Sequence, residues 1–181
     1  MTPPAPASNG SAASAAFDGA RFDGTNINPI TLLATDYLNH FNEAIMLLEM
    51  LPMAPECKED FLAWTPMSYC EHFAASRFKF RDLAIAAYHV ADGAARTELN
   101  EITRQMTTIL TATREGMERD LSPRTIGSLA EEAARWLKSL VARAGSVING
   151  EQAGAAANVP AKRQDAIDAL FSRAVEQAIP A

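Results

Sequence analysis

Apolar residues recur every three or four positions along most of this chain, which is the spacing of helices that bury one face. Asn28 and Pro29 open the first such segment with a capping residue and a proline suited to a first helical turn. The pattern predicts helices over residues 29–51, 55–64, 68–91, 96–119, 123–144 and 160–178. No segment reads convincingly as a sheet strand. We therefore expect an all-α fold, an irregular antiparallel bundle of four main helices with a short helix between the first two.

Residues 77–81, RFKFR, are ambiguous because they alternate like a strand or like an aromatic and basic nucleic-acid patch. In a helix over 68–91, Phe80 lies on the main apolar stripe and Phe78 points nearly the opposite way. That helix would then have two apolar faces. We expect it to be central in the bundle, or to contact a partner or a second subunit through Phe78.

Composition divides the chain into four parts. Residues 1–27 are rich in Ala, Pro, Ser, Gly and Asn, so ordering them would cost entropy with little burial in return, and we expect a disordered arm. Residues 28–144 form the predicted bundle domain. Residues 145–159 have the composition of a flexible linker, which tethers an amphipathic helix over 160–178.

Overall composition narrows the classes of function. A net charge of -6 disfavours sequence-independent binding to nucleic acid or to anionic lipid. The N-terminus lacks the basic start and apolar core of a secretory signal, and no stretch approaches the roughly 20 apolar residues that span a bilayer. Cys57 and Cys70 are too few for a disulfide framework. We expect a cytoplasmic protein with reduced cysteines and with no nucleic-acid or membrane partner.

His40 and Glu43 raise the question of a metal site, because helix bundles hold iron with Glu-x-x-His pairs that project inward. Here the order is reversed and there is no second copy. In a helix, His40 shares a stripe with apolar residues, whereas Glu43 lies with Met46 and Met50 on a more polar face. The pattern favours a partly buried histidine beside a solvated glutamate.

His72 is a second candidate ligand, either with the other two histidines or with the two cysteines. In one continuous helix, however, His72 and His89 would lie roughly 25 Å apart, at 1.5 Å per residue. A zinc site with Cys57 and Cys70 lacks the usual C-x-x-C spacing. A metal site of His40, Glu43 and His72 is therefore only an alternative, and we expect no cofactor.

A group of aromatic residues surrounds Thr65 and Pro66. Its members are Phe61, Trp64, Tyr69 and Phe73. They would suit a ligand pocket between helices, although packing in a core is the commoner role of large aromatic residues. The chain has no nucleophile elbow, Gly-rich phosphate loop or zinc-protease motif.

Residues 164–171, QDAIDALF, resemble the short Q-D-x-I-D-A-L peptide of flagellar switch proteins and the terminal helix of the chemotaxis phosphatase. In those families the peptide docks on a receiver domain. The resemblance implies that Ile167, Leu170 and Phe171 are anchors for a partner. The alternative is that this apolar stripe packs on the bundle or on a second subunit.

The leading prediction is a non-enzymatic protein-interaction module that acts as an adaptor or regulator. One form of this prediction is a homodimer. Its predicted anchors are Ile167, Leu170, Phe171 and Phe78. One alternative is a helical-bundle enzyme that binds a metal or small ligand through His40 and another histidine. The other is a signalling protein whose C-terminal helix docks on a receiver domain.

Overall fold

The computed structural model describes residues 22–151. Their elements in chain order are the 3-10 helix η3 (Thr35–Tyr37) and the helices α1 (Leu38–Met50), α2 (Cys57–Ala63), α3 (Tyr69–Ala75), α4 (Arg81–Val90), α5 (Gly93–Met117) and α6 (Pro123–Ile148). No strand occurs within these residues, and one isolated β-bridge joins Ile27 to Ala34. The predicted all-α fold is confirmed.

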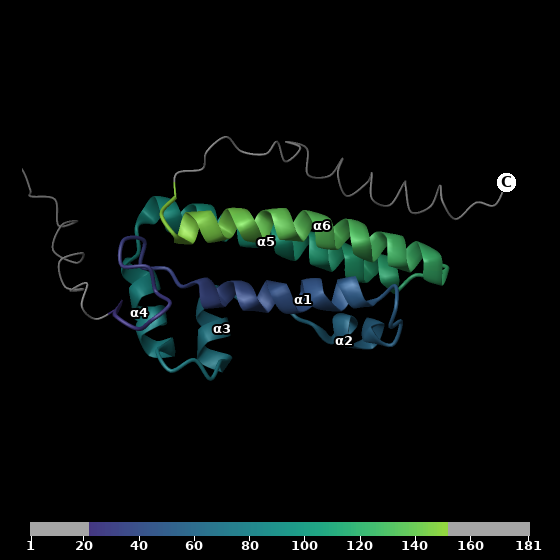
Figure 1. Ribbon diagram of the computed structural model, residues 1–181, viewed down its shortest axis with the longest axis horizontal. Coiled ribbons are helices and arrows are strands. Elements are labelled where there is room, and N and C mark those ends of the chain that lie inside the picture. Colours follow the sequence, from purple (N-terminus) through teal and green to yellow (C-terminus); the bar gives the residue numbers. More distant parts are fainter. Residues whose placement is uncertain (1–21, 152–181) are drawn as a thin grey trace, which may run out of the picture.

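Three helices, α1, α5 and α6, run side by side along the long axis of the molecule (Figure 1). α6 packs against both α5 and α1, α2 lies against α1, and α3 and α4 pack on each other at one end. α1 and α6 are antiparallel, since Leu38 lies beside Gly145 and Pro52 lies beside Gly127. No helix in residues 22–151 is long and apolar enough to cross a membrane.

The core lies where these three helices meet. Phe41 and Leu48 of α1, Leu99 and Met106 of α5 and Leu137 of α6 are fully buried there. Each of them belongs to the apolar stripe that the sequence pattern assigns to its helix. Removing these stripes from water is the main driving force for the assembly of the bundle.

Side-chain caps fix where the later helices begin. Ser68 and Glu71 form a capping box, in which Glu71 Oε2 accepts from the Ser68 amide at 2.8 Å. Ser122 caps α6 and Pro123 occupies its first turn. Asp92 follows the end of α4 at Val90 and caps the start of α5.

The prediction of one helix over 68–91 is wrong, because a turn at residues 76–80 separates α3 from α4. The Ser76 hydroxyl donates to the Phe73 carbonyl at 2.9 Å and accepts from the Phe78 amide at 3.2 Å. These local bonds replace the helical ladder. Most of RFKFR is therefore neither strand nor helix, and α4 begins only at Arg81.

The first helix also begins later than predicted. The Asn28 side chain accepts from the amides of Ile30 and Thr31, but it caps a tight turn rather than a helix. Leu32 in this turn has a φ of 60°, a left-handed conformation that residues other than glycine rarely adopt. The helical ladder of α1 starts only at Leu38.

Two predicted domain boundaries shift. Phe22 and Ile27, assigned to the disordered arm, are buried in the core. α6 continues to Ile148, so residues 145–148 are helix and not linker. The predicted C-terminal helix over 160–178 lies outside the described residues, together with its anchors Ile167, Leu170 and Phe171.

Candidate functional site

His40 of α1 is buried and holds the chain between α2 and α3 against the bundle. Its ring stacks on Trp64 with 4.6 Å between ring centroids and bonds to the backbone carbonyl of Thr65. In return, the Trp64 indole donates to the His40 carbonyl at 3.1 Å. Within residues 22–151, the buried His40 Nε2 has no hydrogen-bond partner.

His72 of α3 approaches His40 with 5.8 Å between the two ring centroids. Burial lowers the pKa of His40 below its ordinary value, and the neighbouring His72 lowers it further. Burial also lowers the pKa of His72, against the opposing effects of Asp36 and Glu43. Both imidazoles are therefore neutral and able to bind a ligand at neutral pH.

The structure thus brings two of the three proposed metal ligands into one cluster. Glu43 acts on His72 only through its charge and is itself exposed. No group of three or more His, Cys, Asp or Glu in the described part of the chain is arranged to hold a metal ion. Two imidazoles alone fall short of the three protein ligands that a catalytic zinc needs.

The turn between α3 and α4 brings His89 next to Cys70, with 4.0 Å between Nε2 and Sγ. Burial raises the pKa of the Cys70 thiol, and Glu71 raises it further. A thiol that stays protonated at neutral pH is a poor nucleophile. The pair is therefore a contact between two side chains and not an activated catalytic dyad.

The four aromatic residues around Thr65 and Pro66 play different roles. Phe61 and Phe73 are fully buried core residues, and Trp64 stacks on His40. Of the predicted pocket residues, Tyr69 alone lines an open pocket of about 390 Å³ between the start of α3 and α5. The sequence pattern missed its other lining residues, which come from η3, from the segment just before α3, and from α3, α4 and α5. They include Tyr37, Glu71, Tyr88, Asn100 and Arg104.

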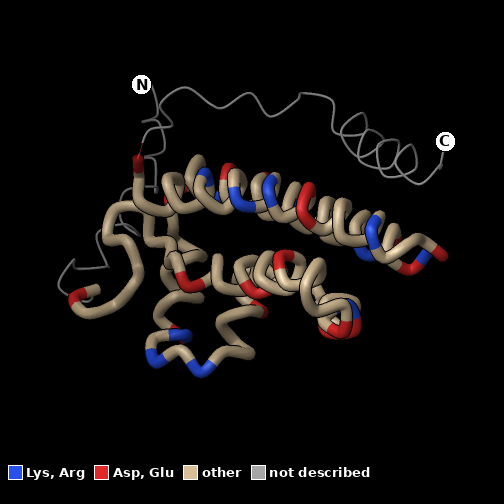
Figure 2. The backbone as a smooth tube through the Cα atoms, turned by 45° about the vertical axis from the view of Figure 1, so that its right-hand side comes forward, with Lys and Arg blue, Asp and Glu red and all other residues tan. Residues whose placement is uncertain are grey.

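Phe78, the predicted anchor within the described residues, is half-buried. Its ring lies 5.5 Å from that of Phe73 and 5.9 Å from that of Phe80. Most of its surface is therefore used in packing against the core of the molecule. Arg77, Lys79 and Arg81 flank it in the sequence, and Figure 2 shows lysine and arginine positions gathered at this end of the molecule.

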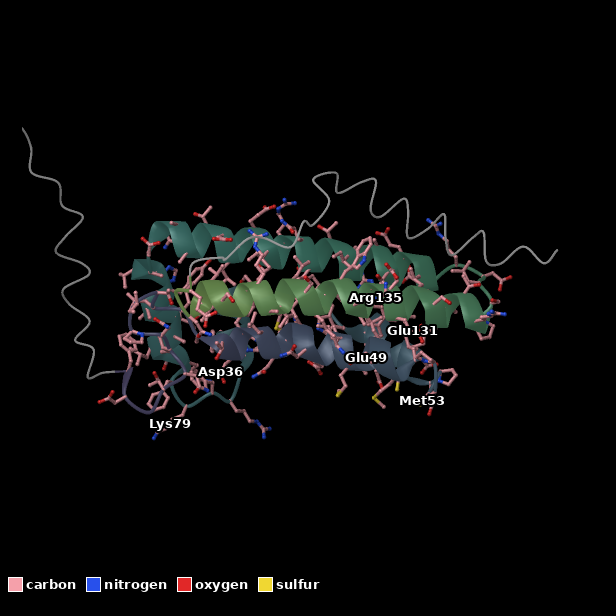
Figure 3. The ribbon with its side chains drawn as sticks, turned by 45° about the horizontal axis from the view of Figure 1, so that its top comes forward. Asp36, Glu49, Met53, Lys79, Glu131 and Arg135 are labelled. Atoms are coloured by element: carbon pink, nitrogen blue, oxygen red, sulfur yellow. The ribbon has the colours of Figure 1, made fainter. Side chains whose placement is uncertain are left out.

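Exposed methionines lie along the outer side of α1 and in the turn that follows it, where Figure 3 shows sulfur atoms projecting near Met53. Met46 is 51% exposed, Met50 40% and Met53 88%, and we call these three residues the methionine face. Glu43 and Glu49 are exposed on either side of it. The sequence held a signal for this face, since two of its methionines fall on the more polar side of the predicted helix.

Comparisons of the chain with family models, with curated proteins and with solved structures each find no match.

Proposed function

We propose that this protein is a non-enzymatic interaction module, an adaptor or regulator, that binds a basic amphipathic helix of a partner protein on its methionine face. One observation carries the proposal: three of the four exposed large hydrophobic side chains of residues 22–151 are methionines, two on α1 and one in the turn that follows it. Apolar side chains that are gathered in this way commonly mark a binding surface.

The spacing of the row suits a helical partner. Met46 and Met50 are four positions apart, so they lie on one side of α1, and Met53 follows in the turn after the helix ends at Met50. An amphipathic helix presents its own anchors at the same spacing. Methionine is unbranched and polarisable, so such a row adapts to different partner side chains.

The charges beside the row select the sign of the partner. Glu43 and Glu49 flank it, and exposed carboxylates continue at the start of α2 with Glu56, Glu59 and Asp60 (Figure 2). Glu49 pairs with Lys138, but both side chains are about half exposed, so this pair is worth about 1 kcal/mol or less and exchanges readily. An acidic rim speeds and orients the approach of a basic helix.

The same rim disfavours a homodimer through this face, because two copies would oppose glutamates to glutamates. A dimer of this protein would need another surface.

We expect the module to act in the cytoplasm. Its two cysteines, Cys57 and Cys70, are unpaired, which agrees with a reducing compartment.

The proposal can be tested with methionine-methyl NMR on the full chain. The probe is a synthetic amphipathic helix of leucine and lysine, and its control is the same peptide with every lysine replaced by glutamate. We expect the lysine peptide to shift the methyl signals of the methionine face and to leave the buried Met106 and Met117 unchanged. Added salt should weaken binding, since the flanking charges are exposed.

Variants distinguish specific binding at this face from nonspecific hydrophobic binding elsewhere on the protein. We expect Met46→Gln combined with Met50→Gln to weaken binding by about tenfold or more, which is about 1.4 kcal/mol. Ile30→Gln is the matched control, because Ile30 is 80% exposed and lies off this face. Equal binding of the glutamate peptide, or equal loss in the Ile30 variant, would overturn the proposal.

One observation supports a second function: the rings of His40 and His72 lie close together. In that version a metal or small ligand binds at the two imidazoles of a helical-bundle enzyme. Metal analysis of untagged protein tests it: near-stoichiometric zinc or iron that His40→Ala removes would support a metal site, and metal-free protein would argue against one.

A further inference from the structure

We propose that the pocket between α3 and α5 binds a free amino acid in its zwitterionic form. The pocket has a volume of about 390 Å³, within the usual range for sites that hold small molecules. It lies apart from the methionine face, and the proposal is independent of the function argued above. The chemistry of its lining indicates the ligand.

Glu71 supplies a carboxylate whose position and charge are both fixed. The backbone amide and side chain of Ser68 hydrogen-bond to it, and they lower its pKa. The capping box holds its Oε2 atom at 2.8 Å from the Ser68 amide, and the side chain is exposed to solvent. A fixed, exposed carboxylate of this kind attracts an ammonium group.

Arg104 supplies the opposite charge from α5. Its Nε and Nη2 atoms bond to Glu101 at 2.8 to 3.0 Å, and Nη1 takes no part in that pair. Both side chains of the pair are about half exposed, so the pair is weak and a ligand carboxylate can compete with Glu101 for the guanidinium. A guanidinium matches the planar geometry of a carboxylate better than any other side chain.

Three tyrosines give the pocket its apolar wall. The rings of Tyr69 and Tyr88 stack with 4.5 Å between centroids, and Tyr37 lies 5.2 Å from Tyr69. Burial raises the pKa of Tyr37 to about 12 and raises that of Tyr69 as well, so both hydroxyls stay protonated. Both hydroxyls already bond within the protein: that of Tyr37 donates to the Met67 carbonyl at 2.9 Å, and that of Tyr69 accepts from the Ala34 amide at 2.8 Å. The tyrosines therefore supply ring surface but no base, which indicates binding rather than catalysis.

Other ligand classes fit this lining less well. A simple anion would meet the charge of Glu71, and a simple amine would meet that of Arg104. A neutral polyol carries no charge to pair with Glu71 or with Arg104. Only a ligand with both an ammonium and a carboxylate pairs both, and an apolar side chain on it would lie against the tyrosine rings.

The test is calorimetric titration of the full chain with each of the standard L-amino acids. For the tightest binder, the methyl ester removes the carboxylate charge and the N-acetyl derivative removes the ammonium charge. We expect each derivative to bind at least about tenfold more weakly, which is about 1.4 kcal/mol. Failure of every amino acid to bind at about 10 mM, a bound of about 2.7 kcal/mol, would overturn the proposal.

Three variants assign the two charges. Glu71→Gln removes the carboxylate charge and keeps the capping box, because glutamine takes the same capping role. Arg104→Gln removes the guanidinium. Arg135→Gln is the control, since Arg135 forms an equivalent i,i+3 pair with Glu132 on α6, away from the pocket.

We expect the first two variants to weaken binding by about tenfold or more and the control to leave it unchanged. Unfolding midpoints within a few degrees of the parent, by circular dichroism, confirm that each variant is folded. Unchanged affinity in the Glu71 and Arg104 variants would overturn the assignment. So would equal loss in the Arg135 control.

Discussion

Replacing His40 by leucine should leave the free energy of unfolding nearly unchanged at pH 7.5, although His40 is only 6% exposed. The change removes the buried Nε2 atom, which has no hydrogen-bond partner within residues 22–151. Leaving such an atom unsatisfied costs about 1 to 3 kcal/mol, so its removal returns a similar amount.

Three losses oppose this gain. The ring hydrogen bond to the Thr65 carbonyl is worth about 0.5 to 1.5 kcal/mol, and Thr65 is exposed, so water can replace that bond. The stack on Trp64 adds about 0.5 to 1.5 kcal/mol. A hydrophobic replacement of similar volume costs up to about 1.5 kcal/mol in packing. The net change lies within about 1 kcal/mol of zero, whereas Leu48→Ala, a fully buried control, should cost about 2 to 5 kcal/mol.

The two variants should also differ in their pH dependence. Burial lowers the pKa of His40 and His72 from the ordinary value of 6.5, so the unfolded state binds protons first as pH falls. The stability from these two groups is therefore complete above pH 6.5 and is lost as pH falls through their lowered pKa values. Because Asp36 and Glu43 oppose the shift at His72, most of this acid sensitivity should disappear in His40→Leu and persist in Leu48→Ala.

Urea denaturation followed by circular dichroism at pH 7.5 and at pH 5.5 measures all of these quantities. A loss above about 2 kcal/mol in His40→Leu at pH 7.5 would refute the reasoning, since it would show that Nε2 holds a partner in solution. Repeating the measurement with a metal chelator would then separate a metal ion from a bound water. An unchanged acid sensitivity would refute the assignment of that sensitivity to His40.

Two further predictions concern the helices. Ser68→Ala should lower the free energy of unfolding by about 0.5 to 2 kcal/mol through loss of the cap on α3, whereas Ser139→Ala, at an exposed position of α6, should change it by less than about 0.5 kcal/mol. Equal losses in chemical denaturation would argue against the cap. Gly145→Ala should raise the free energy of unfolding by about 0.5 to 1 kcal/mol, because the added methyl would lie 4.0 Å from Leu38 and alanine favours a helix interior. A lower unfolding midpoint would contradict the described packing of α6.

Helices with strong local signals were predictable from the sequence. Ser122 and Pro123 mark the start of α6, and the apolar stripe that follows continues without interruption. The start of α1 was not predictable in this way. Asn28 and Pro29 suit the first turn of a helix and a tight turn equally well, and burial of Phe22 and Ile27 against the bundle decides for the turn.

The candidate sites were harder to predict than the helices because they depend on where the chain bends. In a single helix over 68–91, His72 and His89 would lie roughly 25 Å apart, and the pattern would bring neither histidine to another potential ligand side chain. The turn at 76–80 contains no glycine or proline, so the sequence carries no clear signal for it. This turn brings His89 to Cys70, while His72 lies beside His40. Helical spacing decides which residues share a face, but a single turn held by one serine decides which faces meet. The same turn carries α4 to α5, so Tyr88 joins Tyr69 in the pocket proposed for an amino acid.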